Sequence, residues 1–206
     1  MQYISKYGYK YIIIFAFLMF VFLAIDMFEC FFVTVFIACV AFFRQRESVK
    51  CTDKSQILVP IDGKISHIGV AEFEGQSCTK VEIDKSIFGV GVLYAVCLAK
   101  TVVLKKRHGL FLCTKMKQSN ALNQRALYIF EDKGFKIYMR VIAGALSRSL
   151  ELEDKPEVSP GDILGFLGSG RVVLFLPKDI KICVSIGERV RSQSTLGYLE
   201  TRSMNA

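Results

Sequence analysis

A glycine-rich turn that leads into an apolar strand contains the residues of greatest chemical interest. Residues 167–177 read Leu-Gly-Ser-Gly-Arg-Val-Val-Leu-Phe-Leu-Pro, and glycine lets the backbone approach a reacting group closely. The hydroxyl of Ser169 stands beside the unhindered carbonyl of Gly168, so it could attack that carbonyl and turn the amide into an ester. β-Elimination would then break the chain and leave a pyruvoyl group in place of the serine. A Gly-Ser pair is equally what a plain turn before a strand contains.

Asp62 is the acidic residue of an Asp-Gly turn. It lies in the sequence Pro-Ile-Asp-Gly-Lys-Ile at residues 60–65. A carboxylate near Ser169 could position the hydroxyl or take its proton. An Asp-Gly pair is also a common hairpin turn in β proteins. The residues alone leave both interpretations open, a proton acceptor and a turn residue.

The cysteines and histidines indicate neither a disulfide framework nor a metal site. The chain has seven cysteines, at positions 30, 39, 51, 78, 97, 113 and 183, and no Cys-x-x-Cys pair. An odd number without such a pair favours a reducing compartment and argues against zinc. The two histidines, His67 and His108, are too few for a histidine-rich site. We therefore expect no bound metal.

Composition and charge indicate a membrane surface as the partner. The chain is 52% hydrophobic with a net charge of +8 and a mean hydropathy of +0.37. A basic protein suits an anionic lipid surface. Nucleic acid is not expected, because no basic run is interleaved with base-stacking aromatic residues. The densest basic cluster, residues 105–108, could contact anionic head groups or form a solvated loop.

The apolar excess lies near the N-terminus and predicts a membrane hairpin. Residues 11–43 are almost continuously apolar; as one helix they would be about 50 Å long, against a hydrocarbon core of about 30 Å. Asp26 and Glu29 fall at the middle, where charge is costly. Two helices, at 8–25 and 29–44, are therefore expected. Basic residues at both outer ends place both ends in the cytoplasm. The alternatives are a half-inserted hairpin and a cleaved signal peptide, against which the lack of a small-residue cleavage site after the first apolar run argues.

After residue 50 the periodicity changes to that of a mainly β domain. Apolar runs with turn signals between them predict strands; they cover residues 57–70, 79–83, 87–98, 101–104, 109–113, 126–131, 135–143, 171–176 and 180–185. Residues 119–125 are expected to form a short helical turn or a loop. We therefore divide the chain into an anchor at 1–50 and a β-rich domain at 51–206.

A weak internal repeat refines the expected fold. Residues 158–164 (VSPGDIL) are echoed by residues 184–190 (VSIGERV), 26 positions later. Each copy puts a glycine-acid turn between two apolar strand ends. Stacked turns of this kind are typical of a barrel-sandwich-like domain, as in biotinyl and lipoyl carriers. Common turn chemistry that happens to recur is the alternative.

The order of these features resembles the small, membrane-anchored form of phosphatidylserine decarboxylase, including archaetidylserine decarboxylases. That family has a short apolar hairpin ending in Phe-Phe-Arg and a Pro-x-Asp-Gly turn. An Ile-Ala-Gly segment, a Gly-Asp turn and a Gly-Ser pair before a strand ending in Phe-x-Pro follow. In this chain the matching residues are 42–44, 60–63, 142–144, 161–162, 168–169 and 175–177.

The resemblance implies a self-processing decarboxylase of phospholipid biosynthesis. The proenzyme would be cut between Gly168 and Ser169, with Asp62 assisting, and Ser169 would become the pyruvoyl cofactor. That ketone would condense with the amine of phosphatidylserine and act as the electron sink when carbon dioxide leaves. The product is phosphatidylethanolamine. The expected location is a bacterial inner membrane with the β domain in the cytoplasm, and a homodimer is a possible assembly.

The chain departs from the family at one motif. The family carries Asp-x-His shortly after an Ile-Phe strand, but residues 87–97 of this chain contain no histidine, and the main one aligns with Ala95. His67 and His108 could substitute only if the fold brings them close, and Tyr94 could donate a proton or simply pack. The missing histidine leaves one alternative: an unprocessed, catalytically degenerate relative with a binding or regulatory role.

Overall fold

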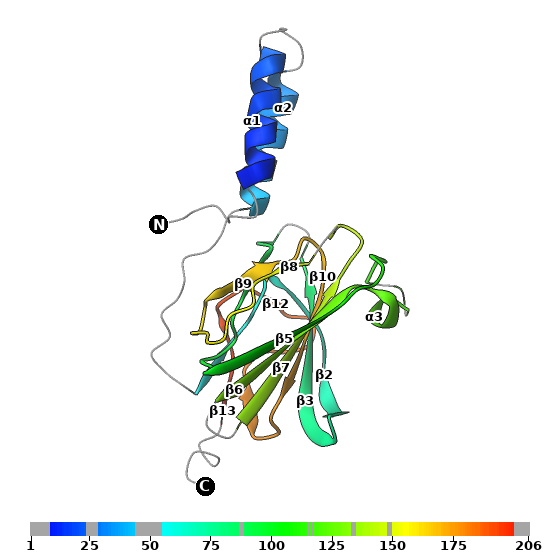
Figure 1. The fold of residues 1–206 in the computed structure, drawn as a ribbon, viewed down its shortest axis with the longest axis vertical. Helices are drawn as coiled ribbons and strands as arrows, with labels where there is room; N and C mark the ends of the chain where they lie inside the picture. Colours follow the sequence, from blue (N-terminus) through cyan, green and yellow to red (C-terminus); the bar gives the residue numbers. More distant parts are fainter. Residues whose placement is uncertain are drawn as a thin grey trace. The chain divides into compact units, whose positions relative to one another are not determined.

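The computed structural model describes two compact units, Met1–Glu47 and Ser48–Ala206. The described residues are 9–23, 29–43, 55–86, 89–114, 116, 118–132, 135–147 and 150–199. Figure 1 shows the helices of the first unit and the sheets of the second. Each unit is treated by itself below.

The first unit contains the two predicted helices, α1 (Tyr9–Leu23) and α2 (Glu29–Phe43), packed against each other. Large apolar side chains such as Phe17, Phe20 and Ile37 are exposed on them. Among the described residues, no helix combines the length and apolar character needed to cross a bilayer. The helical pair is therefore present, whereas its insertion in a membrane stays a prediction. The predicted turn at Asp26 lies outside the described residues, and so do the basic flanks except Lys10, which falls within α1.

The second unit is mainly β, as predicted, and its named strands form three antiparallel sheets (Figure 1). The largest has the order β12-β2-β3-β10-β7-β6-β5, and two three-stranded sheets have the orders β1-β13-β11 and β4-β9-β8. The strands are β1 (Gln56–Leu58), β2 (Gly63–Phe73), β3 (Gln76–Lys85), β4 (Val92–Tyr94), β5 (Thr101–Arg107), β6 (Arg125–Asp132), β7 (Phe135–Ala143), β8 (Glu151–Leu152), β9 (Ile163–Phe166), β10 (Gly170–Leu176), β11 (Ile180–Ile182), β12 (Arg189–Val190) and β13 (Thr195–Leu199).

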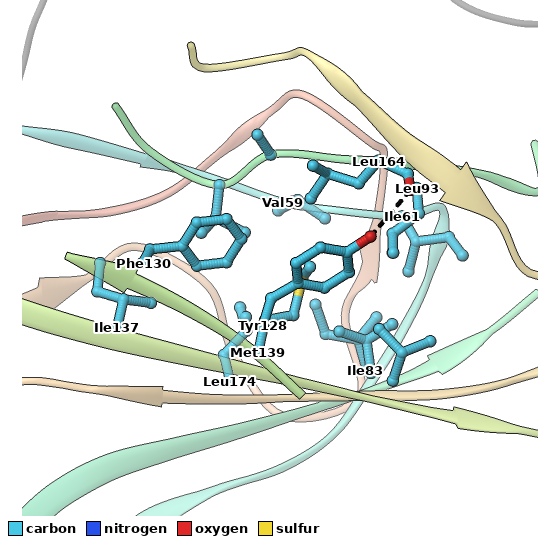
Figure 2. Close-up of a cluster of buried hydrophobic side chains, with 14 of the residues drawn as sticks. Val59, Ile61, Ile83, Leu93, Tyr128, Phe130, Ile137, Met139, Leu164 and Leu174 are labelled. Carbon is cyan, nitrogen blue, oxygen red and sulfur yellow. Dashed lines mark hydrogen bonds between the residues drawn. The ribbon is translucent and has the colours of Figure 1, made fainter. Parts of the chain in front are cut away.

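The hydrophobic core lies on one face of the seven-stranded sheet. Alternate residues of a strand point to opposite faces, so Val172 and Leu174 of β10 enter the main cluster while Val173 and Phe175 enter a smaller one. The main cluster also takes side chains from β1, β4, β9 and β13, which places the two small sheets over this face. In Figure 2, Tyr128 lies among these apolar side chains, and its hydroxyl donates to the carbonyl oxygen of Leu164 at 3.0 Å.

Several details of the predicted fold are wrong. The seven-stranded sheet ends at two edge strands, β12 and β5, so it does not close into a barrel. The described part of the run 109–113 forms no strand: Leu110 makes an isolated bridge to Asn123. Of the run 87–98, only β4 is a named strand. The short helical turn was correct and forms α3 (Ser119–Leu122).

The internal repeat corresponds to two turns of the same geometry. Gly161 and Gly187 have φ angles of +83° and +89°. In each turn the acid that follows the glycine accepts a hydrogen bond from a serine amide three residues earlier, Asp162 from Ser159 at 2.7 Å and Glu188 from Ser185 at 2.8 Å. Each turn then exchanges two backbone hydrogen bonds with another segment, at Ala95 and at Ile65 respectively. The repeat is therefore structural.

Candidate functional site

Strand register brings the two predicted site residues to the same end of the large sheet, where β2 and β10 begin. Gly63 of β2 pairs with Lys85 of β3, and Gly170 of β10 pairs with Ala143 of β7. β3 and β10 are neighbours. The starts of β2 and β10 therefore lie beside the ends of β3 and β7. Asp62 immediately precedes β2, and Ser169 immediately precedes β10. One strand, β3, lies between β2 and β10, so the backbones of the two residues are about 10 Å apart.

Ser169 is half-buried and is held by the turn of residues 144–147. Its Oγ accepts a hydrogen bond from the Leu146 amide at 2.8 Å. Its carbonyl oxygen accepts from the Gly144 amide at 2.9 Å and from the Ser147 hydroxyl at 2.7 Å. Its amide donates back to the Ser147 Oγ at 2.8 Å. Both peptide groups and the hydroxyl of Ser169 are thus fixed by one short segment.

The glycines around Ser169 are required by close packing. A Cβ on Gly170 would lie 2.2 Å from the carbonyl oxygen of Ile142, and the residue has a φ of +150°. A Cβ on Gly144 would lie 2.9 Å from the Ser169 Oγ. A Cβ on Gly168 would sit 3.2 Å from the Leu146 carbonyl oxygen. Larger residues at these positions would displace the turn or the serine.

Asp62 is buried and accepts hydrogen bonds at both carboxylate oxygens. Oδ1 accepts from the Ser192 amide at 2.7 Å and Oδ2 from the Val90 amide at 3.1 Å. The segment it holds at Val90 continues to Gly91, whose carbonyl oxygen accepts from the Leu167 amide at 2.8 Å. Asp62 is therefore connected, through residues 90–91, to Leu167, the residue just before the Gly168–Ser169 bond.

Lys85 is the charged neighbour of Asp62. Its ammonium group donates to the carbonyl oxygens of Ser86 and Gly89 at 2.7 and 3.2 Å. Burial lowers the pKa of Lys85 from 10.5 to about 8, and the charge of Asp62 offsets part of that effect. A buried lysine at this end of the sheet was not anticipated from the sequence.

The residues considered as replacements for the missing histidine are either exposed on the surface or fully buried in the core. His67, within β2, and His108, just after β5, are both exposed. Tyr94 and Ala95 are fully buried, and the Ala95 side chain lies in the main hydrophobic cluster. Both histidines are therefore surface residues.

An arginine side chain could clamp a phosphate or a carboxylate, and Arg171 and Arg140 differ in their surroundings. Arg171 forms ion pairs with Asp84 at 2.6 Å and with Glu82 at 3.1 Å, so its charge is already neutralised. Arg140 stands over the rings of Phe73 and Phe175, 5.3 Å from each centroid. Arg148 lies outside the described residues.

Sequence reasoning singled out Gly168, Ser169 and Asp62 as candidates but not Ser147, which the structure places against Ser169. Ser147 is only 3% exposed, and nothing in the sequence around it indicates a role. The one available signal was its position three residues after Gly144, in a segment already singled out for its Ile-Ala-Gly motif. A buried serine three residues past a glycine is consistent with a tight turn that brings the serine hydroxyl back toward the chain.

The chain is similar in sequence to known proteins. The model of the family described as phosphatidylserine decarboxylase matches residues 35–198. A protein of Syntrophotalea carbinolica named phosphatidylserine decarboxylase proenzyme is 30% identical over 94% of this chain and 95% of its own length. Proteins of the same name from Syntrophus aciditrophicus and Porphyromonas gingivalis are each 30% identical, over 76% and 79% of this chain and 77% of their own lengths. No solved structure matches the chain.

Proposed function

Because this chain belongs to the phosphatidylserine decarboxylase family, we propose that it is a self-processing enzyme that converts phosphatidylserine to phosphatidylethanolamine. The observation that carries the proposal is the setting of Ser169. Its hydroxyl is fixed by the Leu146 amide, and the residues on both sides are glycines. An N–H donor at that oxygen stabilises the alkoxide that forms when the hydroxyl gives up its proton before attack. The chain would break between Gly168 and Ser169.

The first half of the reaction is an acyl shift at that bond. The Ser169 Oγ attacks the carbonyl carbon of Gly168, the C–N bond breaks, and the nitrogen of residue 169 takes up the proton released by the hydroxyl. The larger N-terminal piece is then joined to the rest by an ester. Glycine at 168 adds no side chain beside the carbonyl that is attacked, and a Cβ there would lie 3.2 Å from the Leu146 carbonyl oxygen.

The residues present fit a pyruvoyl group at position 169. A serine supplies the β-oxygen that elimination needs, and the turn 144–147 already holds the carbonyl of the same residue. The group would supply a ketone that can condense with the amine of phosphatidylserine. It would also delocalise the electron pair that remains on the substrate carbon when carbon dioxide leaves. We assign the substrate from the family and from the names of the relatives.

Asp62 is proposed to assist chain cleavage. Its carboxylate is buried at the same end of the sheet as Ser169. It accepts a hydrogen bond from the Val90 amide, and the next residue, Gly91, accepts one from the Leu167 amide just before Gly168. The buried ammonium of Lys85 favours the ionised form of Asp62, since an opposite charge stabilises a carboxylate. A charged Asp62 could act as a proton acceptor or as an electrostatic guide for the serine.

We further propose that residues 1–50 hold the protein on a bacterial inner membrane, with the β domain in the cytoplasm. The support is the pair of apolar helices and the net charge of +8. The basic cluster 105–108 is exposed at edge strand β5, where it could contact anionic head groups. Charged side chains on an edge strand also prevent unwanted sheet pairing. A homodimer remains part of the proposal without a specified interface.

The test is the state of the purified full-length protein in detergent. We expect two pieces, the smaller one with a hydrazine-reactive carbonyl at its new N-terminus, and release of carbon dioxide from phosphatidylserine. A chain that stays whole and carries no such carbonyl would instead support the unprocessed relative, to which the absence of the Asp-x-His motif points.

A further inference from the structure

We propose that the turn of residues 144–147 catalyses the elimination half of chain cleavage, with Ser147 as its catalytic side chain; this inference rests on the proposed function. Ser147 is 3% exposed. Its hydroxyl donates to the carbonyl oxygen of Ser169 at 2.7 Å and accepts from the Ser169 amide at 2.8 Å. The hydroxyl therefore touches atoms of the reacting residue itself.

Elimination starts from the ester that joins Gly168 to the side-chain oxygen of residue 169. The Cα proton of residue 169 passes to water, and the electron pair it leaves spreads onto the carbonyl oxygen of the same residue. That pair then forms the Cα–Cβ double bond while the Cβ–O bond breaks, and Gly168 leaves as a carboxylate. The enamine left behind moves a proton from its nitrogen to Cβ, which becomes a methyl group, and water then hydrolyses the resulting imine to the ketone and releases ammonia.

Negative charge therefore develops on the carbonyl oxygen of residue 169, where two donors already converge. The Ser147 hydroxyl lies 2.7 Å from that oxygen and the Gly144 amide 2.9 Å. Preorganised donors aimed at such an oxygen act as an oxyanion hole. Ser147 is buried, so its hydrogen bond is strengthened by the low local dielectric.

The leaving oxygen has its own donor in the same turn. The Leu146 amide lies 2.8 Å from the Ser169 Oγ, and this oxygen becomes part of the departing Gly168 carboxylate. The turn thus places one donor at the leaving group and two at the carbonyl that receives the electron pair. Backbone amides supply two of these donors whatever the sequence, so Ser147 is the donor that mutation can remove.

The deciding experiment measures cleavage of full-length Ser147→Ala beside wild type. We expect cleavage slowed on the order of 100-fold, the typical effect of removing one oxyanion-hole donor. Because the acyl shift would still occur, the ester should accumulate. Neutral hydroxylamine would then split the variant after Gly168 and release a C-terminal piece that begins with an unmodified serine, which intact-mass spectrometry identifies.

Three further arms make the result decisive. Ser147→Cys keeps the size and a weaker donor and should regain part of the rate. Ser119→Ala removes another buried hydroxyl, which donates to the Met116 carbonyl oxygen at 2.7 Å, and should cleave normally. Wild-type cleavage with an unaffected Ser147→Ala, or slowing without the ester, overturns this inference alone. Wild type that never cleaves overturns the proposed function and this inference with it.

Discussion

Ser169 shows how the surroundings of a common side chain can hold it in one position. Its hydroxyl, amide and carbonyl are each engaged by residues 144–147. Glycines at 168 and 170 keep the neighbouring backbone close to that turn, since a Cβ at 170 would overlap the Ile142 carbonyl oxygen. The Gly-Ser pair and the glycine after it were visible in the sequence. The donors around them were not, because they come from a segment more than twenty positions away, as the contact of Leu146 with Ser169 illustrates.

Asp62 offers a test of whether its carboxylate does more than hold a turn. In Asp62→Asn, one side-chain oxygen is replaced by an NH₂ group that cannot accept from the Val90 or Ser192 amide. We expect stability to fall by about 1–3 kcal/mol and chain cleavage to slow by about 100-fold or more if the charge assists it. Gel analysis over time measures cleavage, and thermal unfolding measures stability.

Asp162→Asn is the matched control, because Asp162 also accepts a backbone amide, that of Ser159, in a glycine-acid turn. It should lower stability without slowing cleavage. Cleavage of Asp62→Asn at the wild-type rate would reduce Asp62 to a turn residue.

Lys85 predicts a pH dependence of stability. Its pKa is about 8 in the folded chain against 10.5 when exposed. Between these values the unfolded chain binds more protons than the folded chain, so stability should rise with pH. The slope is at most about 1.4 kcal/mol per pH unit. Urea unfolding in the Ser169→Ala background, which keeps the chain whole, should show this rise relative to the additional variant Lys85→Met. Parallel pH profiles for the two proteins would contradict the assignment.

At the scale of elements, the paired glycine-acid turns show which patterns the sequence could predict. The repeat could be recognised in the sequence because both turns need a glycine with a positive φ angle followed by an acidic residue. Strands β8 and β12, of two residues each, leave none, because they are too short for alternation to appear. The apolar run 109–113 was misleading because Asn123 satisfies the Leu112 backbone with its side chain, through bonds of 2.9 and 2.8 Å. Strand pairing is not needed there.

The second turn gives a clean measure of what its glycine contributes. Gly187 has a φ of +89°, and a Cβ there would have Lys64 Cε at 3.9 Å as its nearest neighbour. Gly187→Ala should therefore cost only the backbone strain, about 1–2 kcal/mol. Gly187→Asn should cost less, because asparagine tolerates this conformation. Equal unfolding midpoints for the two variants would show that the turn relaxes to another conformation.

At the scale of the whole molecule, the site depends on a strand order that the sequence does not reveal. β10 lies between β3 and β7, and β2 pairs with both β3 and β12. This order brings Asp62 and Ser169 to the same end of the sheet. Strand periodicity predicted the mainly β character, but long-range partners leave no periodic signal. The two residues were identified together by family resemblance, and the sheet register supplies the physical reason for their proximity.

The proposed anchor makes a prediction for the chain as a unit. If residues 1–50 form a membrane hairpin, both termini should lie in the cytoplasm. A reporter fused after Ala206 in the Ser169→Ala background should then be active only when it is a cytoplasmic reporter, and removal of residues 1–50 should release the protein from membranes. Activity of a periplasmic reporter at the same position would contradict this topology.

The central claim is that the chain breaks itself at Gly168–Ser169, and intact-mass spectrometry of the wild type beside Ser169→Ala tests it most directly. Alanine has no β-oxygen, so neither the acyl shift nor the elimination can take place. We predict two pieces for the wild type, the C-terminal one beginning with a carbonyl group in place of the Ser169 amine, and one intact chain for Ser169→Ala. A wild-type chain that keeps its full mass and does not react with hydrazine would contradict the account.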